Sequence, residues 1–321
     1  MIDYGNIGLW EKVRRNKIAY NYILPAAILM AIVTAFPILY QIWMSFTNFS
    51  ISNLKNPHPD IVGISNFLKI FKNQVALENF NFLRTLLFNI FWTVANVILH
   101  VTIGISLAVA LNSPGLALKK FYRALLIVPW AVPSYISALI WRNMFDTQFG
   151  AVNQLLGKIG LPNMIPWLTN PNAPISFLSF LSYAFYACLI TNVWLGFPFM
   201  MVVATGALQS IPLELYEAAK IDGVNERGKF FLITWPLIRI VMMPAIMLGI
   251  VWTFNQFNVI YLVSAGGPLG TTEILVTQAY KLVNPAALFG IASAFGLIIF
   301  FILLGITLLT NRVTKATESV V

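Results

Sequence analysis

The stretch EAAKIDGVNERGKFFLITWP, residues 217–236, is the most hydrophilic part of a strongly apolar chain. It contains six charged side chains within thirteen residues, although only 10% of the 321 residues are charged. Long apolar segments lie on both sides of it. Charged residues between two such segments are typical of a loop that joins membrane spans.

The overall composition supports this interpretation. The chain is 59% hydrophobic with a mean hydropathy of +0.79, whereas soluble domains are about 45–50% apolar and about 25% charged. The net charge of +9 could suggest a nucleic-acid partner. The charges lie between apolar segments, however, which fits membrane topology better, and we expect no nucleic-acid binding. The single cysteine, Cys188, excludes an intrachain disulfide.

Six segments reach the length of about 20 apolar residues that a membrane-spanning helix needs. They are residues 18–46, 84–112, 121–145, 176–208, 237–263 and 286–310. The first is too long for a cleaved signal peptide and should stay as a membrane anchor. Helices are expected because backbone groups in lipid must be satisfied internally, and prolines inside the segments should kink them. The sequence thus predicts an all-α integral membrane protein with six transmembrane helices.

Lys and Arg residues indicate the orientation. Thirteen of them lie near the ends of the spans on the side of both termini and of residues 217–236, against seven on the opposite side. By the positive-inside rule, both termini are cytoplasmic. We expect a multi-pass protein of the cytoplasmic (inner) membrane, with a cytoplasmic segment 1–17, a membrane domain 18–310 and a cytoplasmic tail 311–321.

The cytoplasmic loop 211–236 has features of a docking element. Pro212 should end the fourth span, and residues 213–223 form a short amphipathic pattern that stops at Gly223, a common helix C-cap residue. A second helical piece follows before Pro236. A plain solvated loop is the simpler alternative, but such connections are usually about 4–6 residues long. The sequence predicts a compact two-helix knob for an unidentified partner.

The segment EAAKIDG followed by FFLITWPLI resembles the EAA motif of binding-protein-dependent ABC importer permeases. The matching positions are Glu217, Ala218, Ala219, Gly223, Ile233 and Pro236. The resemblance implies that this segment is a coupling helix, seated on a cytoplasmic ATPase subunit, with Glu217 as the charged contact. On this basis the expected coupling residues are Glu217, Ala218, Ala219, Asp222 and Gly223.

Three further segments resemble the MalF-type sugar permeases of that family: FYRALLIVPWAVPSYISALIWRNMFDTQFGAVNQLL, VWLGFPFMMVVATGALQSIP and WTFNQFNVIYLVSAGGP. The resemblance covers about residues 85–310 and implies the type I ABC importer permease fold in its compact six-span form, as the first of two permease subunits. It implies a second homologous permease as a heterodimer partner, two ATPase subunits that bind ATP and Mg, and an extracytoplasmic solute-binding protein. The chain lacks the G-x-x-x-x-G-K-[ST] pattern, so we expect no cofactor and no enzymatic activity of its own.

Polar residues within the spans suggest a substrate path, because such residues are costly in lipid. One set, Asn89, Asn96 and His100, shares a face of the second predicted helix. No Asp, Glu, Lys or Arg lies at the middle of a span, which argues against a proton relay or a metal or sodium site. Neutral amides suit sugar hydroxyls, although each could instead link helices.

The resemblance to sugar permeases implies substrate contacts in the PWAVPS, NVWLG and FN segments. With the neighbouring amides, the expected pathway residues are Trp130, Ser134, Asn192, Leu195, Gly196, Asn255, Gln256 and Asn258. Val251 matches a position that is small and polar in the maltose-type protein. The expected substrate is an oligosaccharide, either maltodextrin-like or acidic, such as an alginate fragment.

Two other functions have less support in the sequence. A stand-alone secondary sugar transporter would need an ion site and usually internal repeats, and neither is visible in the sequence. A membrane scaffold or enzyme has no support from metal-ligand spacing, a nucleophile motif or paired carboxylates within the spans.

Overall fold

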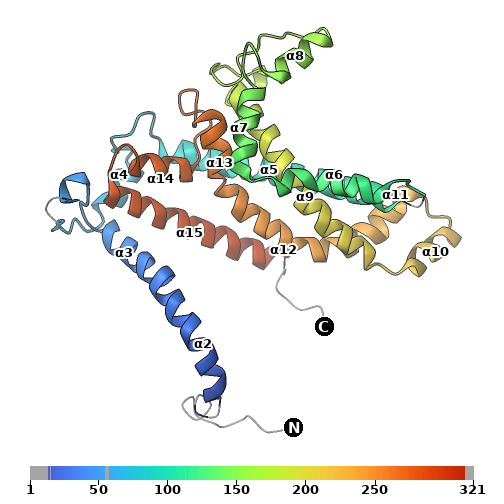
Figure 1. The fold of residues 1–321 in the computed structure, drawn as a ribbon, viewed down its shortest axis with the longest axis horizontal. Helices are drawn as coiled ribbons and strands as arrows, with labels where there is room; N and C mark the ends of the chain where they lie inside the picture. The colour runs from blue at the N-terminus through green and yellow to red at the C-terminus, as the bar shows by residue number, and fades with distance from the viewer. Residues whose placement is uncertain (1–13, 15, 55–57, 114, 315–321) are drawn as a thin grey trace.

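The computed structural model describes residue 14 and residues 16–54, 58–113 and 115–314. Within these residues all regular secondary structure is helical, apart from an isolated antiparallel bridge between Thr47 and Ile61 (Figure 1). Five helical stretches are long and apolar enough to cross a membrane, and a sixth results if helices α6 (Lys119–Ala131) and α7 (Ser134–Met144) form one broken span. The predicted all-α membrane fold is confirmed.

Four of the predicted spans match observed helices closely. The first consists of α2 (Lys17–Met30), the π-helix η1 (Ala31–Ala35) and α3 (Phe36–Ser45), and the others are α5 (Phe82–Asn112), α9 (Tyr183–Gln209) and α15 (Phe289–Thr314). Helix α9 begins seven residues later than predicted, because Ser182 is extended and Ser176–Leu178 form a separate 3₁₀ turn, η3.

Two prolines are accommodated without ending a helix. Segment η1 lies just before Pro37, and the π-helix η4 (Phe230–Thr234) lies just before Pro236, with the same spacing. A proline ring clashes with the carbonyl four residues earlier and offers no N–H. In both cases that carbonyl belongs to the π-helical segment, whose wider turn accommodates the ring.

The predicted span 121–145 is two helices joined by a sharp bend, and not one kinked helix. Helices α6 and α7 meet at an angle of 93°. Val132 is extended, with φ −83° and ψ 132°, as expected for a residue that precedes a proline, and Pro133 then starts α7. The sequence predicted a kink here, but the chain turns by a right angle.

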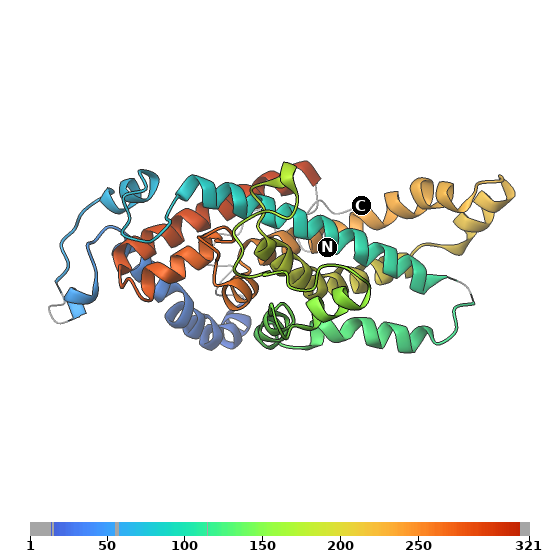
Figure 2. The same cartoon turned by 90° about the horizontal axis from the view of Figure 1, so that it is seen from above.

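Short helices lie at the two ends of the molecule. Figures 1 and 2 show α4 (Ser65–Phe71) and α14 (Leu275–Val283) at one end and α10 (Leu213–Ile221) at the other. Helix α2 has no buried residue and extends away from the other helices, while α3 packs along α15. An even number of crossings would put both ends of the described chain on one side. The cytoplasmic assignment of that side stays a prediction, and residues 1–13 and 315–321 of the predicted end segments lie outside the described part.

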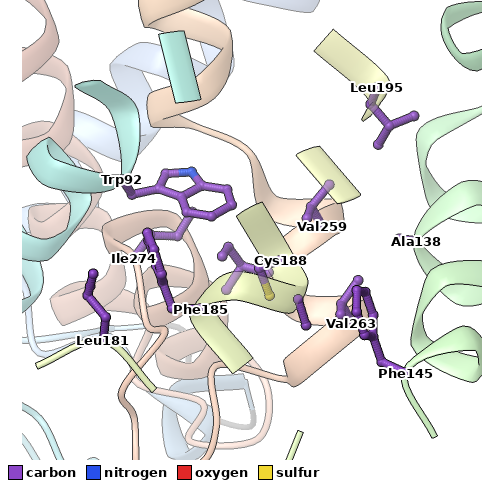
Figure 3. Close-up of a cluster of buried hydrophobic side chains, with 12 residues drawn as sticks. Trp92, Ala138, Phe145, Leu181, Phe185, Cys188, Leu195, Val259, Val263 and Ile274 are labelled. Atoms are coloured by element: carbon purple, nitrogen blue, oxygen red, sulfur yellow. The ribbon is translucent and has the colours of Figure 1, made fainter. Parts of the chain in front are cut away.

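Tight packing joins α5, α9 and the helices that follow. Figure 3 shows one buried cluster, which contains Trp92 of α5, Phe185 and Cys188 of α9 and Val263 of the π-helix η5 (Ile260–Ser264). Nearer to α10, a Cβ atom on Gly104 would come within 2.7 Å of the Met200 Cβ. A small residue at this position lets the two backbones approach closely, as is common between membrane helices.

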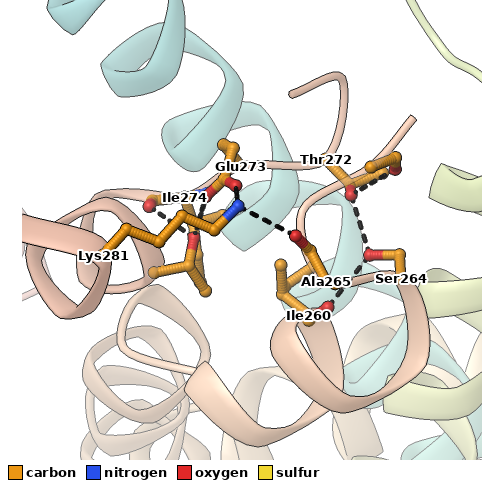
Figure 4. Close-up of polar contacts among 9 residues, drawn as sticks. Ile260, Ser264, Ala265, Thr272, Glu273, Ile274 and Lys281 are labelled. Atoms are coloured by element: carbon orange, nitrogen blue, oxygen red, sulfur yellow. Dashed lines mark hydrogen bonds and ion pairs between the residues drawn. The ribbon is translucent and has the colours of Figure 1, made fainter. Parts of the chain in front are cut away.

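A network of polar contacts fixes the loop between η5 and α14 (Figure 4). Lys281 forms an ion pair with the buried Glu273, and its Nζ also donates to the Ala265 carbonyl over 3.0 Å. Thr277 Oγ1 donates to Glu273 Oε2 over 2.5 Å, and the Ser264 and Thr272 hydroxyls lie 2.8 Å apart. The buried carboxylate is thus paired and hydrogen-bonded, as a charge in the interior must be.

Candidate substrate cavity and coupling loop

A cavity of about 530 Å³ lies where the α6–α7 bend, α9 and the end of α12 (Trp235–Phe254) meet. Its wall consists of His100, Pro129, Trp130, Ala131, Val132, Pro133, Ser134, Asn192, Leu195, Gly196, Phe199, Met200, Gly249, Val251, Trp252, Thr253, Asn255 and Gln256. None of these residues is Asp, Glu, Lys or Arg. The cavity therefore offers amides, the hydroxyl side chains of Ser134 and Thr253, the His100 imidazole and aromatic faces.

Seven of the eight residues predicted to form the pathway line this one cavity: Trp130, Ser134, Asn192, Leu195, Gly196, Asn255 and Gln256. The eighth, Asn258, is not part of the wall. Its Nδ2 donates to Ser134 Oγ over 2.9 Å, so it positions a wall residue. The structure brings the predicted set together from three separate segments, and contact with a substrate stays a prediction.

Hydrogen bonds between amides hold the wall together. Asn192 Nδ2 donates to Asn96 Oδ1 over 2.8 Å, and Gln256 Nε2 donates to Asn192 Oδ1 over 3.0 Å. The His100 ring nitrogen Nε2 lies 3.0 Å from the Asn192 carbonyl oxygen. These bonds link α5, α9 and the segment after α12, so Asn96 and His100 have the helix-linking role that was the alternative for each of them.

A break between α12 and the short helix α13 (Phe257–Val259) places two of the amides. The helix ends at Phe254, and Asn255 and Gln256 leave helical geometry before α13 begins. Neighbouring side chains bind the carbonyls at the break: Asn89 Nδ2 donates to Phe254 O over 3.1 Å and Trp92 Nε1 to Thr253 O over 3.3 Å. Non-helical backbone within a membrane is tolerated when it is buried in protein or lines a cavity, and here it does both.

Gly196 is required by its closeness to His100. A Cβ atom at this position would overlap the imidazole ring of His100. The glycine therefore allows α9 to approach α5 at the level of the cavity, and it leaves the ring able to reach the Asn192 carbonyl.

Sequence reasoning missed an aromatic part of the wall. The ring of Phe199 lies 5.8 Å from that of Trp130 and 5.4 Å from that of Trp252, so three rings form a continuous surface. Helical spacing could have identified two of them, since Phe199 follows Asn192 by seven positions and Trp252 precedes Asn255 by three.

The loop between α9 and α12 is a folded element. Helix α10 follows Pro212 and ends before Gly223, which has a φ of +74° that favours glycine. Tyr216 and Thr234 join the two sides of the loop through their hydroxyls, 2.9 Å apart. This hydrogen bond joins α10 to the segment that leads into α12.

The second half of the predicted knob is not a separate helix. Helix α11 (Glu226–Lys229) runs through η4 directly into α12, and Asn225 caps it by accepting a hydrogen bond from the Gly228 N–H over 2.8 Å. The π-helical segment carries the helix past Pro236, where the sequence indicated a boundary. The helix that contains the predicted fifth span therefore begins at Glu226, eleven residues before the predicted start of the span.

The predicted coupling residues lie on α10 and just after it. Ala219 is buried against the rest of the loop, whereas Glu217, Ala218, Asp222 and Gly223 are exposed. Within the described residues, Glu217 forms no ion pair. Exposed Leu213 and Ile221 add apolar surface at the same tip. This arrangement suits binding to another protein, and the role of each residue stays a prediction.

Residues 100–317 match the model of the family described as binding-protein-dependent transport system inner membrane component. The chain is 36% identical over 310 residues to the galactooligosaccharides transport system permease protein GanP of Bacillus subtilis, covering 92% of this chain and 70% of that protein. It is 34% identical over 327 residues to the maltodextrin transport system permease protein MalC of Streptococcus pneumoniae, covering 97% and 71% respectively.

The fold is also similar to a solved structure of a bacterial ABC transporter involved in the import of the acidic polysaccharide alginate. The TM-score is 0.79 with 22% sequence identity, covering 97% of this chain and 99% of the matched chain. At that identity the likeness concerns the fold alone.

Proposed function

The chain belongs to the family of binding-protein-dependent transport system inner membrane components, and on that premise we propose that it is a permease subunit of an ABC importer for oligosaccharides. Curated relatives at 34–36% identity carry galactooligosaccharides and maltodextrin in their names, which supports a sugar as the cargo.

One structural relationship supports this function most directly. Helices α9 and α12 both line the cavity, and they are also the two helices that loop 210–225 joins. Because α11, η4 and α12 form one continuous helix, a force on the loop would be transmitted along this helix to the cavity wall. Closure of partner subunits against α10 would thereby move the wall as a rigid body.

The cavity also indicates the class of sugar. Its wall has no Lys or Arg side chain to neutralise a carboxylate, and an unpaired anion in such a site would be costly. Its amides and three aromatic rings suit the hydroxyls and ring faces of a neutral sugar. We therefore assign a neutral oligosaccharide to this chain, although its fold is similar to that of an alginate importer.

The proposal includes partner subunits. A second homologous permease would complete the path, two cytoplasmic ATPase subunits would bind ATP and Mg and contact α10, and an extracytoplasmic solute-binding protein would deliver the sugar. A solved complex of the alginate transporter contains a periplasmic protein bound to alginate pentasaccharide, which supports such a delivery protein. The chain itself would hold no nucleotide.

Reconstitution tests the proposal. Proteoliposomes with this chain, its second permease and the ATPase subunits are supplied with the solute-binding protein and labelled malto-oligosaccharide, galacto-oligosaccharide or alginate oligosaccharide. We expect uptake and stimulated ATP hydrolysis with a neutral sugar and little with alginate. Stimulation by alginate alone would overturn the neutral assignment, and uptake by this chain without ATPase subunits would favour a stand-alone transporter.

A further inference from the structure

A second, apolar groove of about 500 Å³ lies along roughly the first three turns of α5, away from the sugar cavity. Leu83, Leu87 and Phe91 line it from α5, and Phe180 and Thr271 line it from the loops beside α9 and α14. The rings of Phe91 and Phe180 meet edge to face at 5.4 Å and form its inner wall.

The groove lies on a face of α5 that other helices of this chain leave open. Leu83 and Leu87 are 61% and 59% exposed, and Val94 and Ile98 continue the same open stripe toward the middle of the helix. Helix α5 has 31 residues and spans a membrane. At about 1.5 Å per residue, the groove descends roughly 10 Å from Arg84 to Phe91. That depth matches the upper part of a lipid acyl chain.

Arg84 supplies a charge at the end of the groove nearest the helix terminus. Its side chain is exposed, and in the described part of the chain the two ion pairs are Lys229–Glu226 and Lys281–Glu273, so no carboxylate neutralises it. Lys72 lies on the same side, next to Phe71, whose ring packs against that of Phe82 at 5.2 Å. A basic end above an apolar groove at a membrane boundary is complementary to a phospholipid.

We propose that this groove binds one phospholipid, with an acyl chain against Leu87, Phe91 and Phe180 and the phosphate on the Arg84 guanidinium. A guanidinium presents paired donors that match phosphate oxygens. The site also borders the loop between η5 and α14, because Thr271 lies in the groove wall and its hydroxyl lies 3.0 Å from that of Ser182, the residue before α9. The proposal requires a membrane and is independent of the sugar that the chain carries.

Native mass spectrometry of the full chain in detergent tests it, with dioleoyl phosphatidylglycerol, dioleoyl glycerol and glycerol phosphate as probes. We expect the wild-type chain to retain one phosphatidylglycerol more tightly than the other two probes. Arg84→Ala should weaken this affinity by about tenfold or more, as expected for the loss of a charged hydrogen bond, and Arg84→Lys should weaken it less. Leu87→Trp, which fills the groove, should also lose the lipid although Arg84 is present.

Arg142→Ala is the matched control, because Arg142 is an exposed arginine at the end of α7 and lies outside the groove. It should leave the affinity unchanged. Equal binding of phosphatidylglycerol to the wild-type and Arg84→Ala chains would overturn the proposal, as would equal affinity for dioleoyl glycerol. Tight binding of glycerol phosphate alone would show a phosphate site without a lipid site and would overturn it too.

Discussion

The side-chain amide of Gln256 donates a hydrogen bond to Asn192 Oδ1 over 3.0 Å and holds the broken end of α12 against α9. The other end of the Asn192 amide is bonded to Asn96. The Asn192 side chain thus links α5, α9 and the segment after α12, and at 2% exposure Asn192 has little surface left for a sugar. Among the predicted pathway residues, Asn192 therefore supports the wall, while the exposed Trp130 faces the cavity.

A double-mutant cycle on Asn258 and Ser134 tests a second such link. Because their side chains are bonded at 2.9 Å, Asn258→Ala and Ser134→Ala should be non-additive, with a coupling of about 0.6 kcal/mol and up to about 1.7. Thermal unfolding of the purified chain measures this coupling. Asn258→Ala combined with Ser106→Ala, an exposed hydroxyl on α5, serves as the additive control. Additivity in both pairs would contradict the link.

Replacing Gly196 tests the close approach of α9 to His100. Gly196→Ala should lower stability by about 1–3 kcal/mol, because its methyl group would overlap the imidazole. Gly206→Ala on the same helix is the matched control, since a Cβ there meets nothing within 4 Å. His100→Ala should recover part of the loss in the double variant. Equal unfolding temperatures for the two glycine variants would refute the overlap.

The sequence predicts most of this fold because membrane spans depend on length and apolarity. Those properties located α5 and α9 within a few residues, apart from the start of α9, where a short 3₁₀ turn precedes the helix. The 93° bend at Pro133 was less accessible: proline indicates that a helix is interrupted, but the packing of α7 against neighbouring segments fixes the angle. At Pro236 the sequence predicted a helix boundary, but the helix continues, because the π-helical turn η4 accommodates the proline.

The sequence identified most residues of the candidate site, but it did not reveal which of them contact each other. Amide side chains within a span are rare enough to be noticed singly, which identified Asn255 and Gln256. Their partners depend on which helices meet, so the bond from Asn258 to Ser134 needed the structure. Trp252 was overlooked because an aromatic residue in an apolar span looks like ordinary packing until it is seen to line a cavity.

Trp252 gives a prediction about sugar affinity. It is 50% exposed, lines the cavity and belongs to the continuous aromatic surface with Phe199. Trp252→Ala should raise the sugar concentration for half-maximal uptake by about five- to tenfold, as expected for the loss of roughly 1–1.5 kcal/mol of aromatic contact. Trp43→Ala, a 43% exposed tryptophan on α3 outside the cavity, should change it little. Equal shifts in both variants would rule out a specific contact.

The buried ion pair between Glu273 and Lys281 of α14 predicts that replacing one member destabilises the chain more than replacing both. Lys281→Met leaves Glu273, 6% exposed, without its cation and should cost about 3–5 kcal/mol of stability. Adding Glu273→Gln should restore much of this loss. Lys229→Met is the matched control, because its partner Glu226 is 89% exposed and such pairs contribute about 0–1 kcal/mol. Thermal unfolding of the wild-type chain and the three variants measures the difference, and a double variant as unstable as Lys281→Met would contradict this account.

Glu217 carries the final prediction, which concerns coupling. Its carboxylate is exposed in the middle of α10 and has no ion-pair partner in the described part of the chain, so a partner subunit can bind it without breaking an internal ion pair. Glu217→Ala should leave the unfolding temperature of the isolated chain unchanged and abolish most of the sugar-stimulated ATP hydrolysis of the assembled complex. Glu214→Ala, one turn earlier on the same helix and also exposed, should retain it. If both variants kept full stimulation, α10 would have to transmit force through its apolar tip, Leu213 and Ile221, and not through the carboxylate.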